Sequence, residues 1–375
     1  MFIVGSIAIG SVLFLYTLWR IIWPLPMRWW WKMLLCIPLV LGAFRYPLLY
    51  GIYGGHFFRP ACPMVVELLC TGLFLSLLIL LVLLLAQELL FLFPSLIWRH
   101  NRKFRRFKLI MYSVTAPLAM VTAGWGMLQA FALPEVREIT IALPKLQHPV
   151  RLAMLTDLHA DRYKQAEFFH EVVARTNALE ADAIVITGDF EDGHLYQLAP
   201  ALAPLRYLKS RWGTFAVHGN HDYFSGHQAW QRYLRSLGIR FLNNEHIQPG
   251  PGHLVFAGVT DPAAGRDKCE APNLEKALDR VPQHKPIVLL AHQPAIAREA
   301  MRHGVELQLS GHTHGGMAPG LRQIVARFND GLVQGLYRRG SLQVYVSNAT
   351  GIWSGLPIRL FTPAEITLIN LVPEN

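Results

Sequence analysis

The stretch that decides the fold is residues 183–189, which read Ala-Ile-Val-Ile-Thr-Gly-Asp. Its four leading apolar residues, bounded by an Asp before and a Gly-Asp pair after, predict a short buried strand of an α/β sheet. Open α/β sheets build their sites at the carboxyl ends of strands, where Asp189 would lie. Because Gly-Asp is also a common turn pair, this stretch alone indicates no more than a strand and a loop.

Four further strand-like runs in the same part of the chain are also followed by Asp, Asn or His. Residues 152–155 precede Asp157 and His159, residues 214–217 precede Asn220, His221 and Asp222, residues 287–290 precede His292, and residues 305–309 precede His312 and His314. Five such endings are hard to ascribe to chance. They predict that several strands deliver polar side chains to one shared site.

Charge and hydropathy divide the chain into two parts. Residues 1–133 hold 11 Lys and Arg against 2 Asp and Glu, whereas residues 134–375 hold 24 against 23. The net charge of +10 therefore belongs almost wholly to the first third, which disfavours a nucleic-acid-binding role. The second part is long enough to bury a core of its own. The four cysteines form no disulfide framework and no zinc-type pairing, and Cys269 reads as a small buried or loop residue.

The first third reads as a membrane region. A membrane-spanning helix needs about 20 consecutive apolar residues. The segments that approach this length are 2–23, 33–53, 65–93 and 109–133. The second is weakened by Arg45 and by two prolines, Pro38 and Pro47. We expect an all-α membrane region of about four helices over residues 1–133, followed by a second domain over residues 134–375.

The basic residues of the loops predict the orientation. Residues 99–108 hold six Lys and Arg, and the first loop holds Arg28 and Lys32, whereas only Arg59 lies clearly in the second loop. Basic loops stay in the cytoplasm. This places residues 134–375 outside the cytoplasm, in a multi-pass protein of the cell's inner membrane.

In the second part, strand-like and helix-like segments alternate, which is typical of an α/β fold. We predict an edge strand over residues 134–145 and later strands over 254–259, 343–347 and 365–371. Helices are expected over residues 163–179, 195–208, 228–237, 273–278 and 295–303.

Seven side chains at the strand ends are candidate metal ligands: Asp157, His159, Asp189, Asn220, His292, His312 and His314. One carboxylate shared between two ions, with three further ligands for each ion, uses all seven. A mixture of carboxylate, amide and imidazole favours Mn, Fe or Zn. Two divalent ions about 3.5–4 Å apart can clamp a phosphoryl group and lower the pKa of a bound water.

The motifs Asp-x-His, Gly-Asp-x-x-Asp, Gly-Asn-His-Asp, His and Gly-His-x-His occur in this order. The chain over residues 136–371 thereby resembles the calcineurin-like metallophosphoesterase superfamily. The resemblance implies a two-sheet α/β sandwich with helices on both outer faces. Together with the apolar first third, residues 258–262 and the Gly pair after His314 resemble the membrane-attached bacterial branch of that superfamily.

The resemblance also implies roles for these residues. Asp157, His159, Asp189 and His314 would hold the first ion, and Asp189, Asn220, His292 and His312 the second, with Asp189 bridging. His221 resembles the family histidine that contacts the phosphate and protonates the leaving oxygen. We interpret Asp192 and Asp222 as partners that orient histidines.

The expected function is a membrane-anchored phosphoesterase, a phosphodiesterase or phosphomonoesterase that uses a metal-bound hydroxide. Its substrate would be a lipid-linked or envelope phosphate ester. One alternative is a pyrophosphatase for a UDP-2,3-diacylglucosamine-type lipid, which needs a cytoplasmic site. Another is a non-catalytic membrane sensor or scaffold, although seven competent ligand residues argue against it. The pattern leaves the oligomeric state open.

Overall fold

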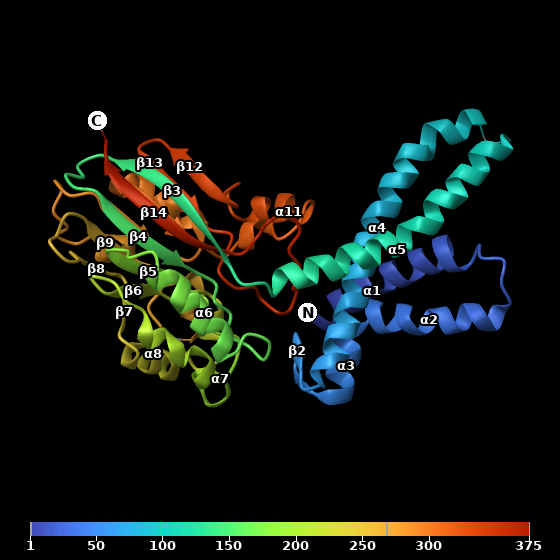
Figure 1. Ribbon diagram of the computed structural model, residues 1–375, viewed down its shortest axis with the longest axis horizontal. Helices are drawn as coiled ribbons and strands as arrows, with labels where there is room; N and C mark the ends of the chain where they lie inside the picture. The colour runs from blue at the N-terminus through green and yellow to red at the C-terminus, as the bar shows by residue number, and fades with distance from the viewer. Residues whose placement is uncertain (1, 99, 268, 375) are drawn as a thin grey trace. The chain divides into compact units, whose positions relative to one another are not determined.

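The computed structural model describes residues 2–98, 100–267 and 269–374. It divides into two compact units, one ending at Leu128 and the other starting at Gln129. The first consists of apolar helices, and the second contains two six-stranded sheets (Figure 1). The predicted two-sheet α/β sandwich, preceded by a region of membrane-type helices, is therefore confirmed.

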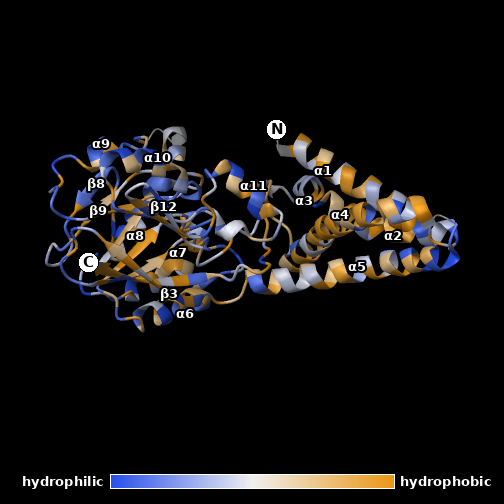
Figure 2. Ribbon diagram, turned by 90° about the horizontal axis from the view of Figure 1, so that it is seen from above, coloured by the Kyte–Doolittle hydropathy of each residue, from blue (hydrophilic) through white to orange (hydrophobic). Residues whose placement is uncertain are grey.

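The first unit holds five α-helices and a small hairpin. They are α1 (Phe2–Thr17), which continues as the π-helix η1 (Leu18–Ile22), α2 (Trp29–Ala43), α3 (Arg45–Tyr53), β1 (Gly55–His56), β2 (Arg59–Pro60), α4 (Met64–Trp98) and α5 (Arg102–Ala130). Among the described residues, three stretches are long and apolar enough to cross a membrane: 3–22, α4 and α5. Their many hydrophobic residues are visible in Figure 2.

The second predicted segment, 33–53, is not one straight helix. It divides into α2 and α3, which are bent by 81°. The bend falls at Phe44, whose φ of −109° and ψ of 23° leave the helical conformation. Pro47 then lies in the first turn of α3, where a proline is tolerated because no helical N–H is lost there. The pair forms a fourth span only if the bent helices count as one, so the number of candidate spans is three or four.

The basic stretch 99–108 is largely helical rather than a loop. Helix α5 begins at Arg102, so most of these cations lie in its first two turns. Asn101 caps the helix, since its Oδ1 accepts hydrogen bonds from the N–H groups of Lys103 at 2.9 Å and Phe104 at 3.3 Å. Lys and Arg are good helix formers, which explains why the helix extends into the basic stretch. Arg99 lies outside the described residues.

Two mixed sheets form the second unit. In order across the first sheet, the strands are β3 (Glu135–Leu143), β14 (Glu365–Pro373), β4 (Val150–Leu155), β5 (Ala183–Thr187), β6 (Thr214–Val217) and β7 (Ile239–Phe241). Across the second sheet they are β12 (Gly335–Arg339), β13 (Leu342–Val346), β11 (Leu307–Ser310), β10 (Ile287–Leu290), β9 (Val255–Gly258) and β8 (Glu245–Ile247). β4 to β7 are parallel, and so are β9, β10, β11 and β13.

Helices cover both outer faces of the sandwich (Figure 1). The α-helices are α6 (Ala166–Asn177), α7 (Leu195–Leu202), α8 (His227–Ser236), α9 (Leu274–Ala277), α10 (Ala297–Ala300) and α11 (Leu321–Phe328). Short 3-10 turns are η2 (Ala203–Tyr207), η3 (His221–Tyr223), η4 (Pro262–Asp267), η5 (Pro294–Ile296), η6 (Met301–His303) and η7 (His314–Gly316).

The strand that decides the fold is buried on both faces. Successive side chains of a strand point to opposite sides of the sheet. Ile184 and Ile186 accordingly pack with the helices outside the first sheet, in the cluster that includes Phe169 and Trp230. Ala183 and Val185 pack into the layer between the sheets, in the cluster that includes Phe256. This double burial explains why the run is apolar throughout instead of alternating.

Candidate metal centre

The parallel strands bring the predicted ligands to one edge of the sandwich. Asp157 and His159 follow β4, Asp189 follows β5, and Asn220 follows β6 in the first sheet; His292 follows β10, and His312 and His314 follow β11 in the second. All are buried except Asn220 and His312, which are half-buried. The candidate ligands form two groups, each with its ligand atoms within 4.8 Å of one another: Asp157, His159 and His314, and Asp189, His292 and His312. A third group of the same kind consists of His159, Asp192 and His221.

The first group surrounds the carboxylate of Asp157. Its Oδ1 lies 3.5 Å from Nε2 of His314 and 3.9 Å from Nε2 of His159. The same His159 Nε2 lies 3.6 Å from Oδ2 of Asp189, so the two groups meet at Asp189. Within the described part of the chain, this buried His159 Nε2 has no hydrogen-bond partner.

The second group surrounds His292. Its Nε2 lies 3.2 Å from Asp189 Oδ2, 3.2 Å from Asn220 Oδ1 and 3.2 Å from His312 Nδ1. Its other ring nitrogen, Nδ1, lies 2.8 Å from the backbone carbonyl oxygen of Thr187. A proton on Nδ1 would bond to that carbonyl and leave Nε2 as the ligand atom.

The pKa shifts at this site differ from one candidate ligand to the next. Burial lowers the pKa of His312 to about 3, and positive charge on His292 adds to the effect. Burial, followed by His159, also holds the pKa of His314 well below its usual range. Burial alone would raise the pKa of Asp189, but His292 and His221 outweigh it and lower the pKa below its ordinary value. His312 and His314 are therefore neutral imidazoles beside a carboxylate, a set that fits divalent Mn, Fe or Zn. Burial lowers the pKa of His292, but Asp189 outweighs it and raises that pKa well above its usual value, so His292 must release a proton when it binds an ion.

The ligand residues adopt an unusual backbone conformation. Five of the seven have positive φ angles: Asp157 (50°), His159 (45°), Asp189 (55°), His312 (70°) and His314 (48°). Only a few per cent of non-glycine residues adopt this left-handed region. Such strain persists where the surrounding structure holds it in place, and it concentrates at functional sites.

Two glycines let the ligand loops approach one another closely. A Cβ on Gly219 would collide with the carboxylate and backbone N of Asp189. On Gly311 it would collide with the side chains of Thr156 and Asp157. The Gly-Asn and Gly-His pairs in the sequence are thus explained by packing against the two carboxylates.

Asp192 connects His159 of the candidate metal centre to His221. Its Oδ2 lies 3.1 Å from His159 Nδ1, and its Oδ1 lies 2.6 Å from His221 Nδ1. Burial would raise the pKa of Asp192, but the two histidines outweigh it and hold the pKa well below its usual range. Burial likewise lowers the pKa of His221, but Asp189 and Asp192 raise it to about 9.

Backbone donors hold the side chain of Asp222, which we expected to orient a histidine. Its carboxylate accepts hydrogen bonds from the backbone N–H groups of Asp189 at 3.0 Å, Phe190 at 2.7 Å and Gly219 at 2.7 Å. The ring of His218 lies farther away, with Nδ1 at 3.7 Å. A carboxylate suits this position because three backbone donors converge on it. It joins the two loops that carry Asp189 and Asn220.

Sequence patterns missed the aromatic and cationic residues around the site. The ring of His221 lies 5.8 Å from that of Trp353 and 5.5 Å from that of Phe224. Arg359 is 1% exposed and donates to the carbonyl groups of Gly351 at 2.6 Å and Thr362 at 3.1 Å. It thereby holds the segment that carries Trp353. This segment is irregular and lacks periodicity, so no sequence signal could have found these residues.

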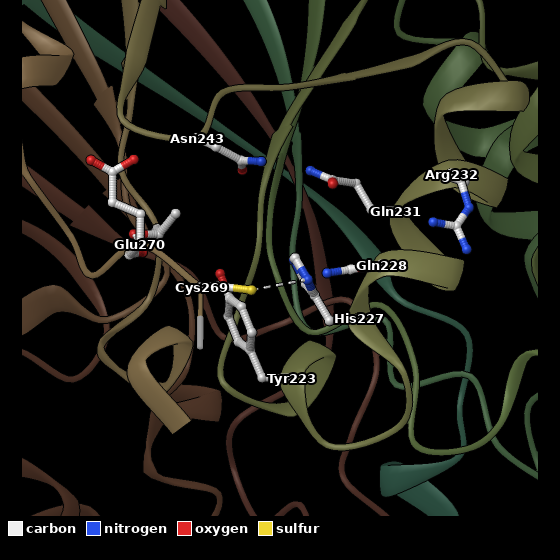
Figure 3. Close-up of a pocket in the computed structure, with 9 residues that line it drawn as sticks. Tyr223, His227, Gln228, Gln231, Arg232, Asn243, Cys269 and Glu270 are labelled. Carbon is white, nitrogen blue, oxygen red and sulfur yellow. Dashed lines mark hydrogen bonds between the residues drawn. The ribbon is translucent and has the colours of Figure 1, made fainter. Parts of the chain in front are cut away.

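A separate pocket of about 420 Å³ is lined by residues outside the ligand set (Figure 3). Tyr223 stacks on His227 with ring centroids 4.5 Å apart, and Nδ1 of His227 lies 3.6 Å from Sγ of Cys269. Cys269 is half-buried, in keeping with its interpretation as a small loop residue. The pocket shares the loop after β6 with the candidate metal centre, but none of its lining residues is a candidate ligand.

An α/β sandwich with clustered Asp and His residues at one edge defines a metallohydrolase. The family profile for calcineurin-like phosphoesterases matches residues 150–316. The chain is 36% identical to an uncharacterized metallophosphoesterase of Helicobacter pylori strain J99 over 261 residues, which cover 69% of this chain and 70% of the relative. It therefore belongs to the calcineurin-like metallophosphoesterase family and is a metal-dependent phosphoester hydrolase.

Two further relatives extend the comparison. A transmembrane protein with a metallophosphoesterase domain from Danio rerio is 34% identical over 268 residues, which cover 68% of this chain and 61% of that protein. The metallophosphoesterase YkuE of Bacillus subtilis is 30% identical over 287 residues, which cover 72% of this chain and 98% of YkuE. Together with the apolar helices, the transmembrane relative indicates that this hydrolase is a membrane protein.

Proposed function

We propose that this chain is a membrane-anchored phosphoesterase that hydrolyses lipid-linked or envelope phosphate esters outside the cytoplasm. Residues 1–133 would form a multi-pass anchor in the inner membrane, and residues 134–375 would form the catalytic domain. The observation that carries the proposal is the cluster of seven candidate ligands with His221 beside it. The candidate spans and the basic residues at the start of α5 support the anchor and its orientation.

The two groups of ligands support a centre of two divalent ions, with Mn, Fe and Zn as the candidates. Asp157, His159 and His314 would hold one ion, Asn220, His292 and His312 the other, and Asp189 both. When bound, such ions neutralise charge on the phosphoryl group and activate the water that attacks it. The chain's own residues position these ligands, because Asp192 and Thr187 bond to the far sides of the His159 and His292 rings.

His221 is our candidate for the general acid. Its Nδ1 bonds to Asp192, which leaves Nε2 as the atom that can act on a substrate. As the P–O bond breaks, Nε2 would donate its proton to the leaving oxygen, while the attacking water supplies the new P–O bond. The side chain of His221 is 20% exposed, so a substrate can reach the ring.

The surroundings of His221 support an apolar leaving group. Phe224 is 54% exposed, and its ring and that of Trp353 lie beside the imidazole at centroid distances of 5.5 and 5.8 Å. An alcohol that carries acyl chains could bury part of its surface between these rings, and each buried CH₂ contributes about 0.8 kcal/mol. A highly charged leaving group would gain little from this wall.

A substrate panel tests the proposal. The purified full chain is assayed with Mn, Fe or Zn on a lipid phosphodiester, a lipid phosphomonoester, water-soluble esters and a nucleotide-linked lipid pyrophosphate. We expect the lipid esters to have the highest kcat/KM, and the Asp189→Asn variant to be inactive on all of them. Preferential cleavage of water-soluble esters would contradict the assignment to lipid-linked substrates.

The orientation is tested separately. A reporter fused after Asn375 should be active only if it functions outside the cytoplasm, and Cys269 should react with a membrane-impermeant thiol reagent in intact cells. A reporter signal confined to the cytoplasm would overturn the outward orientation. The pyrophosphatase for a UDP-2,3-diacylglucosamine-type lipid would then be the better proposal.

A further inference from the structure

Helix α11 presents apolar side chains to solvent. At 100° per residue, Leu321, Ile324, Val325 and Phe328 fall within one stripe about 100° wide, the pattern of a helix that covers an apolar partner. Yet none of its eight described residues is buried. Ile324 is 57% exposed and Phe328 77% exposed. Figure 2 shows hydrophobic and hydrophilic residues alternating along this short helix.

Basic residues border the stripe on both sides. Arg322 and Arg327 lie about 110° from its centre on opposite sides, and both are exposed. The helix contains no acidic residue. An apolar stripe flanked by cations is the pattern of helices that lie in the interface of an anionic bilayer. A partner surface rich in cations would be repelled.

A second exposed aromatic residue follows a segment that is bonded to the turn before the helix. Phe361 is 92% exposed, and its φ of 61° is rare for a bulky residue. The N–H of the preceding residue, Leu360, donates to the carbonyl of Met317 at 2.8 Å. Met317 precedes α11 by four residues, so Phe361 belongs to the same end of the domain. We call α11 together with Phe361 the α11 surface.

The chain tethers this end of the domain to the last candidate span. Helix α5 ends at Ala130, and β3 begins at Glu135, so four residues connect them. Four extended residues span at most about 14 Å. The N–H of Glu135 donates to the carbonyl of Ala364 at 2.9 Å, three residues after Phe361. The tether therefore enters the domain beside the α11 surface.

The same edge carries the candidate metal centre. In the first sheet, Glu135 pairs with Glu365 of β14, and Thr367 of β14 pairs with Met154, near the carboxyl end of β4. Asp157 follows that end directly. The tether and the candidate metal centre therefore belong to the same edge of the second unit.

We propose that the α11 surface lies on an anionic lipid bilayer, with Ile324, Phe328 and Phe361 inserted at the level of the headgroups. Arg322 and Arg327 contact the lipid phosphates. The surface does not depend on which ester the enzyme hydrolyses. It does give a physical reason for a lipid-borne substrate, because docking brings the catalytic edge to the membrane plane.

Photo-crosslinking of the full chain tests this surface. The photoreactive amino acid p-benzoylphenylalanine replaces Phe328 or, as the control, Asp279. The side chain of Asp279 is 69% exposed, and it precedes the amino end of β10, away from the tether. The protein is reconstituted in vesicles of phosphatidylglycerol and phosphatidylcholine, irradiated, and examined by mass spectrometry.

We expect at least tenfold more lipid adduct from position 328 than from position 279. Equal yields would overturn the proposal. A predominance of protein adducts at position 328 would overturn it too, because a second copy or another protein would then cover the helix.

The arginines provide an independent measurement. With the crosslinker at position 328, the pair Arg322→Glu and Arg327→Glu should lower the lipid adduct severalfold in anionic vesicles and leave it unchanged in pure phosphatidylcholine. An unchanged yield in anionic vesicles would refute the contact with lipid phosphates. The Asp189→Asn variant should give the native yield of adduct, which separates docking from catalysis. Thermal unfolding temperatures confirm that each variant is folded.

Discussion

Replacement of Asp192 with Asn tests whether one buried carboxylate serves both the metal cluster and His221. In the native chain its two oxygens face two ring nitrogens, Nδ1 of His159 at 3.1 Å and Nδ1 of His221 at 2.6 Å. An asparagine has the same shape but only one accepting oxygen. Its NH₂ group must therefore face one of the two rings, and that ring has to give up its proton on Nδ1 or lose the bond.

Either outcome damages the site. If His159 changes tautomer, its Nε2 carries a proton and cannot bind a metal ion. Loss of a partner behind a metal ligand typically costs about 10–100-fold in metal affinity or activity. If His221 is the ring affected, it loses the negative charge that favours its protonated form. Complete loss of general acid catalysis lowers the rate by about 10²–10⁴-fold. Since the imidazole remains, we expect a loss of about 10²-fold in kcat/KM, equivalent to about 2.7 kcal/mol.

The assay is the initial rate on a chromogenic phosphodiester at saturating Mn²⁺, together with the metal content of the purified full chain. The matched control is Asp182→Asn, at the amino end of β5. Asp182 accepts from the N–H of Arg151 at 2.9 Å and pairs with exposed Arg211 at 3.2 Å, far along the strand from the site. We expect the control to stay within twofold of the native rate. A rate for Asp192→Asn within threefold of native, with native metal content, would refute the reasoning.

Three further substitutions probe the same centre. Asp189→Asn should abolish turnover and lower the metal content while the protein stays folded, because Asp189 adjoins both groups of candidate ligands. Near-native activity with two ions bound would contradict its bridging role. His221→Ala should keep its metal ions and lose about 10²–10⁴-fold in kcat, whereas loss of metal would place His221 among the ligands. In Gly311→Ala, the new Cβ meets the side chains of Thr156 and Asp157. Because this disturbs the ligand geometry, we expect metal affinity to fall at least about tenfold. Its control is Gly265→Ala, because a Cβ on Gly265 meets no atom within 4 Å.

The sequence was informative where burial imposes a strict pattern. Strands β5, β6 and β10 are mostly apolar because they are covered on both faces, and β4 and β11 carry apolar residues at most positions or at alternate ones, so their positions and the α/β class could be predicted. Short or exposed elements were missed. Strand β7 has three residues, too few for a period to emerge. Helix α11 was missed because it is short: its apolar stripe spans only eight residues, none of which is buried.

In the membrane region, the sequence predicted the helices but not where each one bends or begins. Composition alone predicted apolar helices at nearly the right places, because a span must be apolar whatever its neighbours are. Composition could not show that Phe44 interrupts the second segment, since the bend depends on how α2 and α3 pack. It also placed Arg102 to Lys108 in a loop, although α5 already begins at Arg102. The cap at Asn101 was a readable signal, because Asn is a preferred N-cap residue.

A regular spacing explains why the candidate ligands could nevertheless be named from sequence. Asp157, Asp189, His292 and His312 each lie two residues after the last residue of their strands. Parallel strands end at one edge, so this spacing alone places four side chains together. Three of these four residues have positive φ angles, which turn the chain sharply at the ligand itself. That turn determines where each carboxylate and imidazole points, and nothing in the residue types predicts it, because Asp and His usually adopt negative φ. The identities of the ligands are therefore encoded locally, whereas the distances between them depend on the packing of loops such as those at Gly219 and Gly311.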